Sequence, residues 1–302
     1  MSKTLTEVQH ETVQNLEVER DSFVQPFLKW AGGKRQLLAT IREYIPKSFK
    51  LYFEPFVGAG AVLFNIQPHF AVISDVNQEL VNCYRIVKTR PHALIAAVRV
   101  HPINSKHFYR LRRQDRDPGL NTLTRVERAA RIIYLNKTCY NGLFRVNSQG
   151  QFNVPYGKYK DPNILNEEVI KAVSKYLKTA TIQISTDDFA NALEGAGRGD
   201  FVYLDPPYDP LSDTSSFTGY NLMSFGREEQ LRLKEVCDDL HRRGCKLLQS
   251  NSATPHIRKL YSDRSKYSIV EVEANRSINS VGTSRGKIGE LLIYNNYKID
   301  KS

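Results

Sequence analysis

The chain has 302 residues, 41% of them hydrophobic and 25% charged, which suffices for a packed core and excludes a chain that is disordered throughout. It contains no run near the ~18 apolar residues of a membrane-spanning helix, and residues 1–22, with five acids and two bases, form a polar tail without the apolar stretch of a signal peptide. Of the net charge of +11, residues 86–169 carry +9, which favours nucleic acid as a partner over a merely solvated charged surface.

The first motif along the chain is a glycine loop, Trp30-Ala31-Gly32-Gly33-Lys34. It lacks the spacing of a Walker A motif. For Trp30, packing in the core is the alternative to a functional role, and for Lys34 a plain surface position is the alternative.

The next predicted unit is a strand, a glycine turn, a helix and a second strand. Leu51–Phe56 is an apolar and aromatic run typical of a strand, and Gly58-Ala59-Gly60 follows it. Residues 71–74 form a second short apolar strand that ends at Asp75, and residues 77–89 have the apolar spacing of a helix. This order predicts a βαβ unit.

The glycine turn of this unit is a candidate nucleoside site. A ligand can approach a glycine backbone closely where the carboxyl end of a strand meets a helix. Asp75 lies 17 residues after Gly58, at the end of the next strand, where a carboxylate can accept both hydroxyls of a ribose. The third glycine of a dinucleotide fingerprint is absent, so an adenosyl group without phosphates is favoured over a pyrophosphate. An ordinary tight turn is the alternative.

The basic segment, residues 86–169, is predicted to be mostly helical. Thr124 followed by Glu127 is a capping-box signature, and the apolar residues after it continue a helix. Residues 145–155 are predicted to form a hairpin that turns near residues 148–150. Tyrosine and asparagine are interleaved with the basic residues, at Tyr109, Tyr134, Tyr140, Asn141, Asn147, Tyr156 and Tyr159. Aromatic and basic side chains together are typical of a surface that binds nucleic acid.

The last third of the chain again alternates strands and helices. Strands are predicted at residues 201–204, 246–250, 267–272 and 290–297. The last two are expected to close the sheet as an antiparallel pair, and Arg227–Arg243 is expected to be a helix that ends before Gly244. Alternation of this kind predicts an α/β fold with a mostly parallel sheet covered on both faces.

Asp205-Pro206-Pro207-Tyr208, directly after the strand at residues 201–204, carries the most specific chemistry. An exocyclic amine of a base is a poor nucleophile because its lone pair is delocalised into the ring. The Asp205 carboxylate and the Pro206 carbonyl can each accept one N–H of such an amine, which favours a pyramidal nitrogen with its lone pair aimed at an electrophile. The prolines stiffen the turn, and Tyr208 offers a face on which a base that has left the duplex can stack. We favour this catalytic interpretation over a rigid turn with a solvated acid, because so specific a tetrapeptide after a buried strand is a rare coincidence.

The four cysteines, at positions 83, 139, 237 and 245, include no CxxC pair. Such scatter indicates a reducing compartment and argues against a disulfide framework and a zinc site. We therefore expect a cytoplasmic protein without a metal ion.

Together these motifs resemble the Dam-type DNA adenine-N6 methyltransferases, especially the branch typified by the methylase of the DpnII restriction system. The resemblance covers residues 23–297 and rests on the segments at residues 27–34, 52–60, 75–77, 140–145, 152–157, 205–208 and 250–252. It implies a Rossmann-like catalytic domain, formed by residues 23–85 and 170–302, with residues 86–169 inserted as a mostly helical target-recognition domain that carries a β-hairpin. It also implies S-adenosylmethionine as methyl donor and GATC in double-stranded DNA as substrate, for an enzyme acting as a monomer on the bacterial nucleoid.

The resemblance further implies a role for particular residues. The catalytic residues would be Asp205, Pro206, Pro207 and Tyr208. The cofactor would be bound by Trp30, Lys34, Phe56, Gly58, Gly60, Asp75 and Asp205. The DNA would be contacted by Tyr140, Asn141, Leu143, Arg145, Asn147, Pro155, Lys158 and Tyr159. Arg145 would read a guanine, and Lys158, which stands where some relatives carry arginine, would contact a phosphate.

Two other functions compete with this interpretation. A cytosine-N4 or RNA-base methyltransferase would use similar chemistry, but a serine in place of Asp205 would have favoured cytosine, whereas the aspartate favours adenine. A DNA-binding regulator that has lost catalysis would be expected to have a damaged glycine turn or Asp-Pro-Pro-Tyr motif, and both are intact.

Overall fold

The computed structural model describes residues 14–15, 20–30, 34–116, 120, 122–210, 225–275 and 287–299. Most of the predicted polar tail at residues 1–22 and the glycines of the loop at residues 31–33 lie outside the described residues. Within the tail, β1 (Gln14–Asn15) pairs antiparallel with β2 (Ser48–Phe49).

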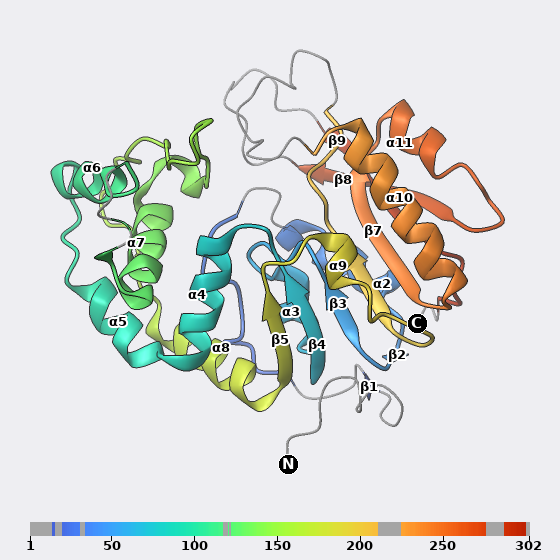
Figure 1. The fold of residues 1–302 in the computed structure, drawn as a ribbon, viewed down its shortest axis with the longest axis horizontal. Helices are drawn as coiled ribbons and strands as arrows, with labels where there is room; N and C mark the ends of the chain where they lie inside the picture. Colours follow the sequence, from blue (N-terminus) through green and yellow to red (C-terminus); the bar gives the residue numbers. More distant parts are fainter. Residues whose placement is uncertain are drawn as a thin grey trace.

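Among the described residues, seven strands form one sheet in the order β5-β4-β3-β6-β7-β9-β8 (Figure 1). The strands are β3 (Tyr52–Glu54), β4 (Phe70–Ser74), β5 (Thr181–Ser185), β6 (Phe201–Leu204), β7 (Lys246–Ser252), β8 (Ser268–Asn275) and β9 (Lys287–Tyr294). Strands β3 to β7 are parallel to one another, whereas β9 is antiparallel to both β7 and β8. The predicted α/β sheet with an antiparallel closing pair is confirmed, and it is consistent with a methyltransferase fold.

Strand β3 lies inside this sheet, with β4 on one side and β6 on the other. Because all three are parallel, their carboxyl ends meet at one edge, where open α/β sheets bind ligands. The glycine turn follows β3, Asp75 follows β4, and Asp205 follows β6. The topology therefore brings the sequence motifs of three separate segments to one edge.

Helices cover the sheet and extend beyond it (Figure 1). They are α2 (Leu38–Tyr44), α3 (Ala61–Ile66), α4 (Gln78–Thr89), α5 (Pro91–Arg99), α6 (Ser105–Arg113), α7 (Arg125–Thr138), α8 (Glu167–Thr179), α9 (Phe189–Ala192), α10 (Arg227–Arg242) and α11 (Pro255–Leu260). The predicted capping box at the start of α7 is confirmed, because Thr124 accepts the amide of Glu127 while the Glu127 carboxylate accepts the amide of Thr124. The predicted end of α10 before Gly244 is also confirmed.

The basic segment is only partly separate from the rest of the core. Leu94 of α5 and Ile133 of α7 belong to the same buried cluster as Tyr52 of β3. A smaller cluster is drawn from this segment alone: Phe108, Leu111, Tyr134, Leu135, Cys139, Phe152 and Val154. The domain boundaries at residues 85 and 170 therefore remain predictions.

The predicted hairpin also remains a prediction. Val146 and Phe152 form a single antiparallel bridge, and the Asn153 amide donates to the Arg145 carbonyl at 3.0 Å. The amide of Asn147 donates to the carbonyl of Gln151 at 2.9 Å, so the chain reverses direction between these two residues. These contacts describe a turn and its flanks rather than two regular strands.

The four cysteines are buried free thiols. Within the described ranges, no helix has the length and apolar character needed to cross a membrane. The same ranges contain no group of three or more His, Cys, Asp or Glu side chains that could hold a metal ion.

Candidate active site

Asp205 and Lys34 form an ion pair at the carboxyl edge of the sheet. Strand β6 is buried along its whole length, and the two prolines after Asp205 end it. Lys34 Nζ lies 2.9 Å from Asp205 Oδ1, and the two side chains are 4% and 22% exposed. Burial raises the pKa of Asp205 above its ordinary value, while the nearby Lys34 ammonium acts in the opposite direction. The plain surface position that was the alternative for Lys34 is therefore excluded.

Tyr208 is held against the same pair. Lys34 Nζ lies 4.6 Å from the centroid of the Tyr208 ring, within the range of a cation–π interaction. The Tyr208 hydroxyl donates to Glu290 Oε2 at 2.8 Å. An ammonium group thus lies between a carboxylate and an aromatic face.

The Asp-Pro-Pro-Tyr turn is anchored to helix α10 and strand β7. Gln230 Nε2 donates to the carbonyl of Pro207 at 2.9 Å, and Asn251 Nδ2 donates to Gln230 Oε1 at 3.0 Å. In the part of the chain that the structure describes, the carbonyl of Pro206 accepts no hydrogen bond. The protein therefore fixes the carbonyl of Pro207, whereas the carbonyl of Pro206 has no such partner among the described residues.

The glycine turn and Asp75 lie beside each other, as predicted. Asp75 Oδ2 accepts the amide of Gly58 at 3.2 Å, and Oδ1 accepts the amide of Asn77 at 2.9 Å. Gly58 has a φ of +47°, and a Cβ there would lie 3.0 Å from Cδ1 of Trp30, so a side chain would be strained and crowded. Gly60 is the N-cap of α3.

The Asp75 carboxyl group is withdrawn from water. This desolvation raises its pKa to about 6, although the two backbone amides that it accepts act in the opposite direction. Each carboxylate oxygen retains acceptor capacity after these bonds, because an ionised carboxylate offers about four lone-pair sites. The group can therefore still accept hydroxyls of a ligand.

Phe56 was also predicted to bind the cofactor, but its ring packs against other aromatic side chains. Its ring stacks on Phe189 at 5.5 Å and meets Phe225 edge-on at 5.7 Å. These contacts account for its position by packing, so its role toward a cofactor remains a prediction.

The sequence interpretation missed the role of Glu54, which is fully enclosed next to this site. Tyr52 donates to Glu54 Oε2 at 2.8 Å, and burial, with a contribution from Asp205, raises the pKa of Glu54 to about 8. The carboxyl group is therefore mostly protonated at neutral pH and adds little negative charge beside Asp205. An acid inside an apolar strand immediately before the glycine turn was the signal that could have identified it.

The sequence interpretation also missed the roles of Gln230 and Glu290, because nothing in the sequence around either residue points to this site. Glu290 lies 82 residues from Tyr208, and Gln230 lies 23 residues from Pro207, on a different element. Only the folded chain shows that these polar side chains hold the turn after β6.

The residues predicted to contact DNA cluster around the 3-10 turn Tyr140–Gly142. The Tyr140 side chain is 48% exposed, and its amide donates to the carbonyl of Pro155 at 2.9 Å. Arg145 Nε donates to Asn153 Oδ1 at 2.8 Å. The structure thus brings the segments at residues 140–145 and 153–155 together.

The other residues of this predicted set have contacts of their own. Leu143 packs against the small cluster of the basic segment, and Tyr159 lies 5.2 Å below the ammonium of Lys29. Asn147 accepts the amide of Gln151 at 2.9 Å, which holds the turn. Asn141 and Lys158 have positive φ angles of 54° and 51°.

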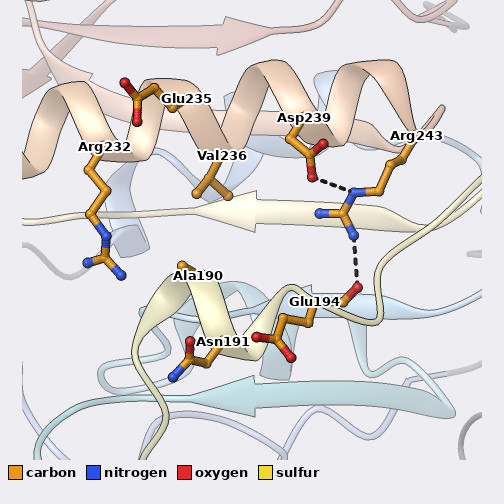
Figure 2. Close-up of a pocket in the computed structure, with 8 residues that line it drawn as sticks. All are labelled: Ala190, Asn191, Glu194, Arg232, Glu235, Val236, Asp239 and Arg243. Atoms are coloured by element: carbon orange, nitrogen blue, oxygen red, sulfur yellow. Dashed lines mark hydrogen bonds and ion pairs between the residues drawn. The ribbon is translucent and has the colours of Figure 1, made fainter.

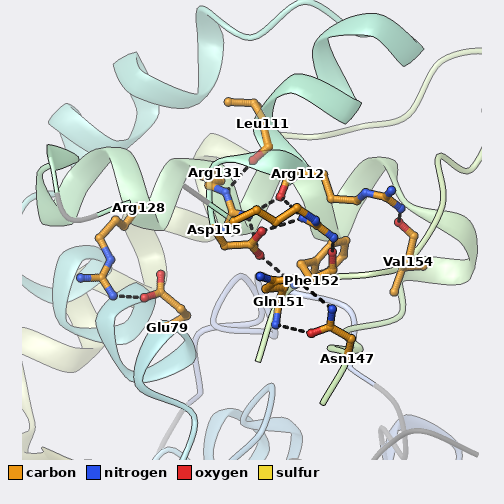
Figure 3. A network of polar contacts seen from close by, with 11 residues as sticks. Glu79, Leu111, Arg112, Asp115, Arg128, Arg131, Asn147, Gln151, Phe152 and Val154 are labelled. Carbon is orange, nitrogen blue, oxygen red and sulfur yellow. Dashed lines mark hydrogen bonds and ion pairs between the residues drawn. The ribbon is translucent and has the colours of Figure 1, made fainter. Parts of the chain in front are cut away.

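Some basic side chains of the segment form ion pairs within the protein, around Asp115 (Figure 3). Asp115 pairs with Arg116 at 2.7 Å and with Arg131 at 2.9 Å, and it accepts the amide of Phe152 at 2.7 Å. Arg116 also donates to the carbonyl of Phe152 at 2.8 Å. Asp115 and its two arginines therefore attach the backbone of Phe152 to helices α6 and α7.

Other arginines of the segment are paired as well. Arg112 donates to the carbonyl of Val154 at 3.2 Å. Arg99 pairs with Glu167, and Arg128 pairs with Glu79. Of the acids in these ion pairs, only Glu79 lies outside residues 86–169, so the other pairs are already included in the segment's net charge of +9.

A surface pocket between α9 and α10 is a separate feature (Figure 2). It is lined by Ala190, Asn191, Glu194, Arg232, Glu235, Val236, Asp239 and Arg243. Asp239 and Arg243 of this lining form an ion pair at 2.9 Å, whereas Arg232 pairs with Asp188 and Glu229 outside it. It shares no residue with the site at the carboxyl edge of the sheet, and we assign no function to it.

Known proteins resemble this chain over most of its length. Residues 30–278 match the model of a family described as D12 class N6 adenine-specific DNA methyltransferases. The chain is 46% identical over 274 residues to the Type II methyltransferase M1.LlaDCHI of Lactococcus lactis subsp. cremoris, which covers 90% of this chain and 95% of that protein.

Two further relatives match over similar shares of this chain and of their own length. The Type II methyltransferase M.MjaIII of Methanocaldococcus jannaschii is 44% identical over 291 residues, covering 90% of this chain and 99% of that protein. The DNA adenine methylase of Escherichia coli K12 is 37% identical over 266 residues, covering 88% of this chain and 93% of that protein. The similarity therefore extends across the sheet and the basic segment rather than over a single motif.

Proposed function

The chain belongs to the D12 class of N6 adenine-specific DNA methyltransferases, and we propose that it methylates a flipped adenine in GATC with S-adenosylmethionine as methyl donor. Family membership makes it a DNA adenine-N6 methyltransferase, so the cytosine-N4, RNA-base and regulator alternatives are not retained. The observation that carries the proposal is the grouping of Asp205, Lys34 and Tyr208 beside the glycine turn and Asp75.

The residues at the glycine turn fit the proposed cofactor. The absence of a side chain at Gly58 lets the Trp30 ring pack against the backbone of the turn, and Asp75 beside it can accept the ribose hydroxyls. When bound, S-adenosylmethionine supplies a methyl group on a positively charged sulfur, which leaves with the bonding electron pair when the methyl is transferred.

The chain's own residues prepare the nucleophile. Lys34 occupies Asp205 Oδ1 and favours the ionised carboxylate, so Oδ2 is left to accept one N–H of the adenine amine. The Pro206 carbonyl accepts the other N–H. The two fixed acceptors stabilise the positive charge that grows on nitrogen, and the proton is then lost to water. The face of Tyr208 supports the base, which must share this space with the Lys34 ammonium or displace it.

Duplex DNA is the proposed substrate because the adenine amine is paired inside the helix and must leave the stack to reach Asp205. The exposed Tyr140 and the basic segment around it support a DNA-facing surface there. One chain contains every residue of the proposed site, which supports action as a monomer, and we propose that it works in the cytoplasm on nucleoid DNA.

The deciding experiment is transfer of tritium from labelled S-adenosylmethionine to matched duplexes with and without GATC. Nucleoside analysis of the product should give N6-methyladenine from the GATC duplex alone. Label in N4-methylcytosine, or equal label in both duplexes, would refute the proposal.

Arg145 is proposed to read a guanine by donating two hydrogen bonds to O6 and N7, which discriminates by about 1–3 kcal/mol. Replacing Arg145 by alanine should slow methylation of GATC but increase tolerance of one altered guanine position by about 5- to 150-fold. The measurement is kcat/KM on a set of singly substituted duplexes.

Lys158 is the matched control for Arg145, because we propose that it contacts only a phosphate. Replacing Lys158 by alanine should slow all duplexes of the set alike. A uniform loss of activity in the Arg145 variant as well would show that Arg145 is an anchor rather than a reader.

The salt dependence of binding should reveal how much of the basic segment faces DNA. If about 6 phosphates are neutralised, the slope of log affinity against log salt should be near −5. Fluorescence anisotropy with a labelled GATC duplex would measure it. A slope near zero would mean that the +9 of residues 86–169 is merely a solvated surface.

A further inference from the structure

Asn136 on α7 is fully buried, and its side-chain amide holds two other segments of the chain. Its Oδ1 accepts the amide of Lys29 at 2.8 Å, and its Nδ2 donates to the carbonyl of Lys29 at 2.7 Å. Nδ2 also donates to the carbonyl of Gly142 at 3.1 Å. One side chain thus ties the residue before Trp30 to the turn Tyr140–Gly142.

The two tied segments also contact each other directly. Trp30 stacks on Phe144, with ring centroids 5.0 Å apart and ring planes 20° apart. A Cβ on Gly142 would lie 2.8 Å from the Cβ of Lys29, so glycine is required for this close approach. Trp30 also packs against the glycine turn, because its Cδ1 would lie 3.0 Å from a Cβ on Gly58. Trp30 therefore contacts both the segment at residues 140–145 and the glycine turn of the proposed cofactor site.

We infer that Asn136 is a positioning residue through which DNA at residues 140–145 and the cofactor at the glycine turn strengthen each other's binding. The inference rests on the proposed function and deepens it by naming how its two ligands are coupled. A ligand that orders Trp30 also orders Phe144 and the turn that Asn136 holds, so the second ligand loses less conformational freedom on binding. Such coupling is reciprocal, and it should be visible from either ligand.

Asn295 provides a matched control, because its amide makes the same kind of backbone clamp elsewhere. It accepts the amide of Leu247 at 2.8 Å and donates to the carbonyl of Cys245 at 2.8 Å, and it is 7% exposed. These partners lie at the start of β7, the end of the sheet opposite to the edge that carries Asp205. Loss of this clamp removes comparable hydrogen bonds without touching either ligand site.

The test uses S-adenosylhomocysteine, which carries no methyl group to transfer, and the full-length protein. Calorimetry gives its Kd with and without a saturating GATC duplex, and the ratio of the two values measures the coupling. We expect a ratio of at least ~5 for the wild type and for Asn295→Ala, and a ratio near ~1 for Asn136→Ala. Phe144→Leu keeps an apolar side chain but removes the ring stack, and it should also lower the ratio. Thermal unfolding of each variant shows that the compared proteins are folded.

The outcomes separate the inference from the proposed function. A wild type that binds both ligands with a ratio near ~1, or an Asn136→Ala protein that keeps the wild-type ratio, would overturn the coupling while leaving the enzyme assignment intact. Equal loss of coupling in Asn295→Ala would also overturn it, because the effect would then follow general stability. A wild type that binds neither S-adenosylhomocysteine nor the duplex would refute the proposed function and the inference with it.

Discussion

Replacing Asp205 by alanine is expected to lower kcat by at least about 10³-fold while the duplex is still bound. Loss of one fixed group that stabilises developing charge costs about 10²–10³ in kcat, and the amine would also lose part of its alignment toward the methyl group. Asp205 acts on the amine of one base and contacts no phosphate in the proposed mechanism, so DNA affinity should change little. Single-turnover methylation and fluorescence anisotropy measure the two effects separately.

A second variant guards this experiment against a folding defect. Asp205→Ala leaves the Lys34 ammonium, which is 4% exposed, without its carboxylate, and an uncompensated buried charge is destabilising. Asp205→Asn keeps the shape and one acceptor oxygen but removes the charge, and it should still lose at least about 10²-fold in kcat. Asp239→Ala, on the exposed side of α10, is the control and should keep wild-type activity. Wild-type turnover in either Asp205 variant would disprove the proposed mechanism.

Replacing Asp75 by asparagine is expected to weaken S-adenosylmethionine binding at least tenfold. Each hydrogen bond to a charged acceptor is worth about 1.5–3 kcal/mol, and the proposed pose uses two of them. Asparagine retains the size of the side chain beside the amides of Gly58 and Asn77, so the glycine turn should be disturbed less than by alanine. Calorimetry measures the affinity, and an unchanged Kd would refute the ribose assignment.

Titration of Asp75 should make the affinity for the cofactor depend on pH. Removal from water raises the pKa of Asp75 to about 6, so the carboxylate becomes protonated as the pH falls through this value. The charged form is the better acceptor for the ribose, so cofactor affinity of the wild type should decline from pH 7 to pH 5. The Asp75→Asn protein lacks the titrating group, and its affinity should stay level over this range. Parallel profiles for the two proteins would assign the titration to another group.

The sequence by itself determined most strands of the sheet, the helices α4, α7 and α10, and the place of the main motifs, but not the edge strand β5. The signals were local: Thr124 and Glu127 start α7, Gly244 follows the end of α10, and two prolines end β6. Parallel strands bring their carboxyl ends to one edge, so the neighbourhood of the glycine turn, Asp75 and Asp205 could be anticipated as soon as the sheet was recognised. Short-range capping, turn and periodicity rules carry this information because they act within a few residues.

Only the tertiary structure decided which side chains face each other at the site. The resemblance implied a site role for Lys34, but only the fold shows that it is buried and pairs with Asp205. Glu290 and Gln230 hold the turn after β6 from elements far along the chain. Arg116 and Arg131 share Asp115 as their partner, a pairing that the charge count of the segment does not show. A buried polar group must find a partner, but any segment that the fold brings near can supply it, and residue spacing contains no record of that choice.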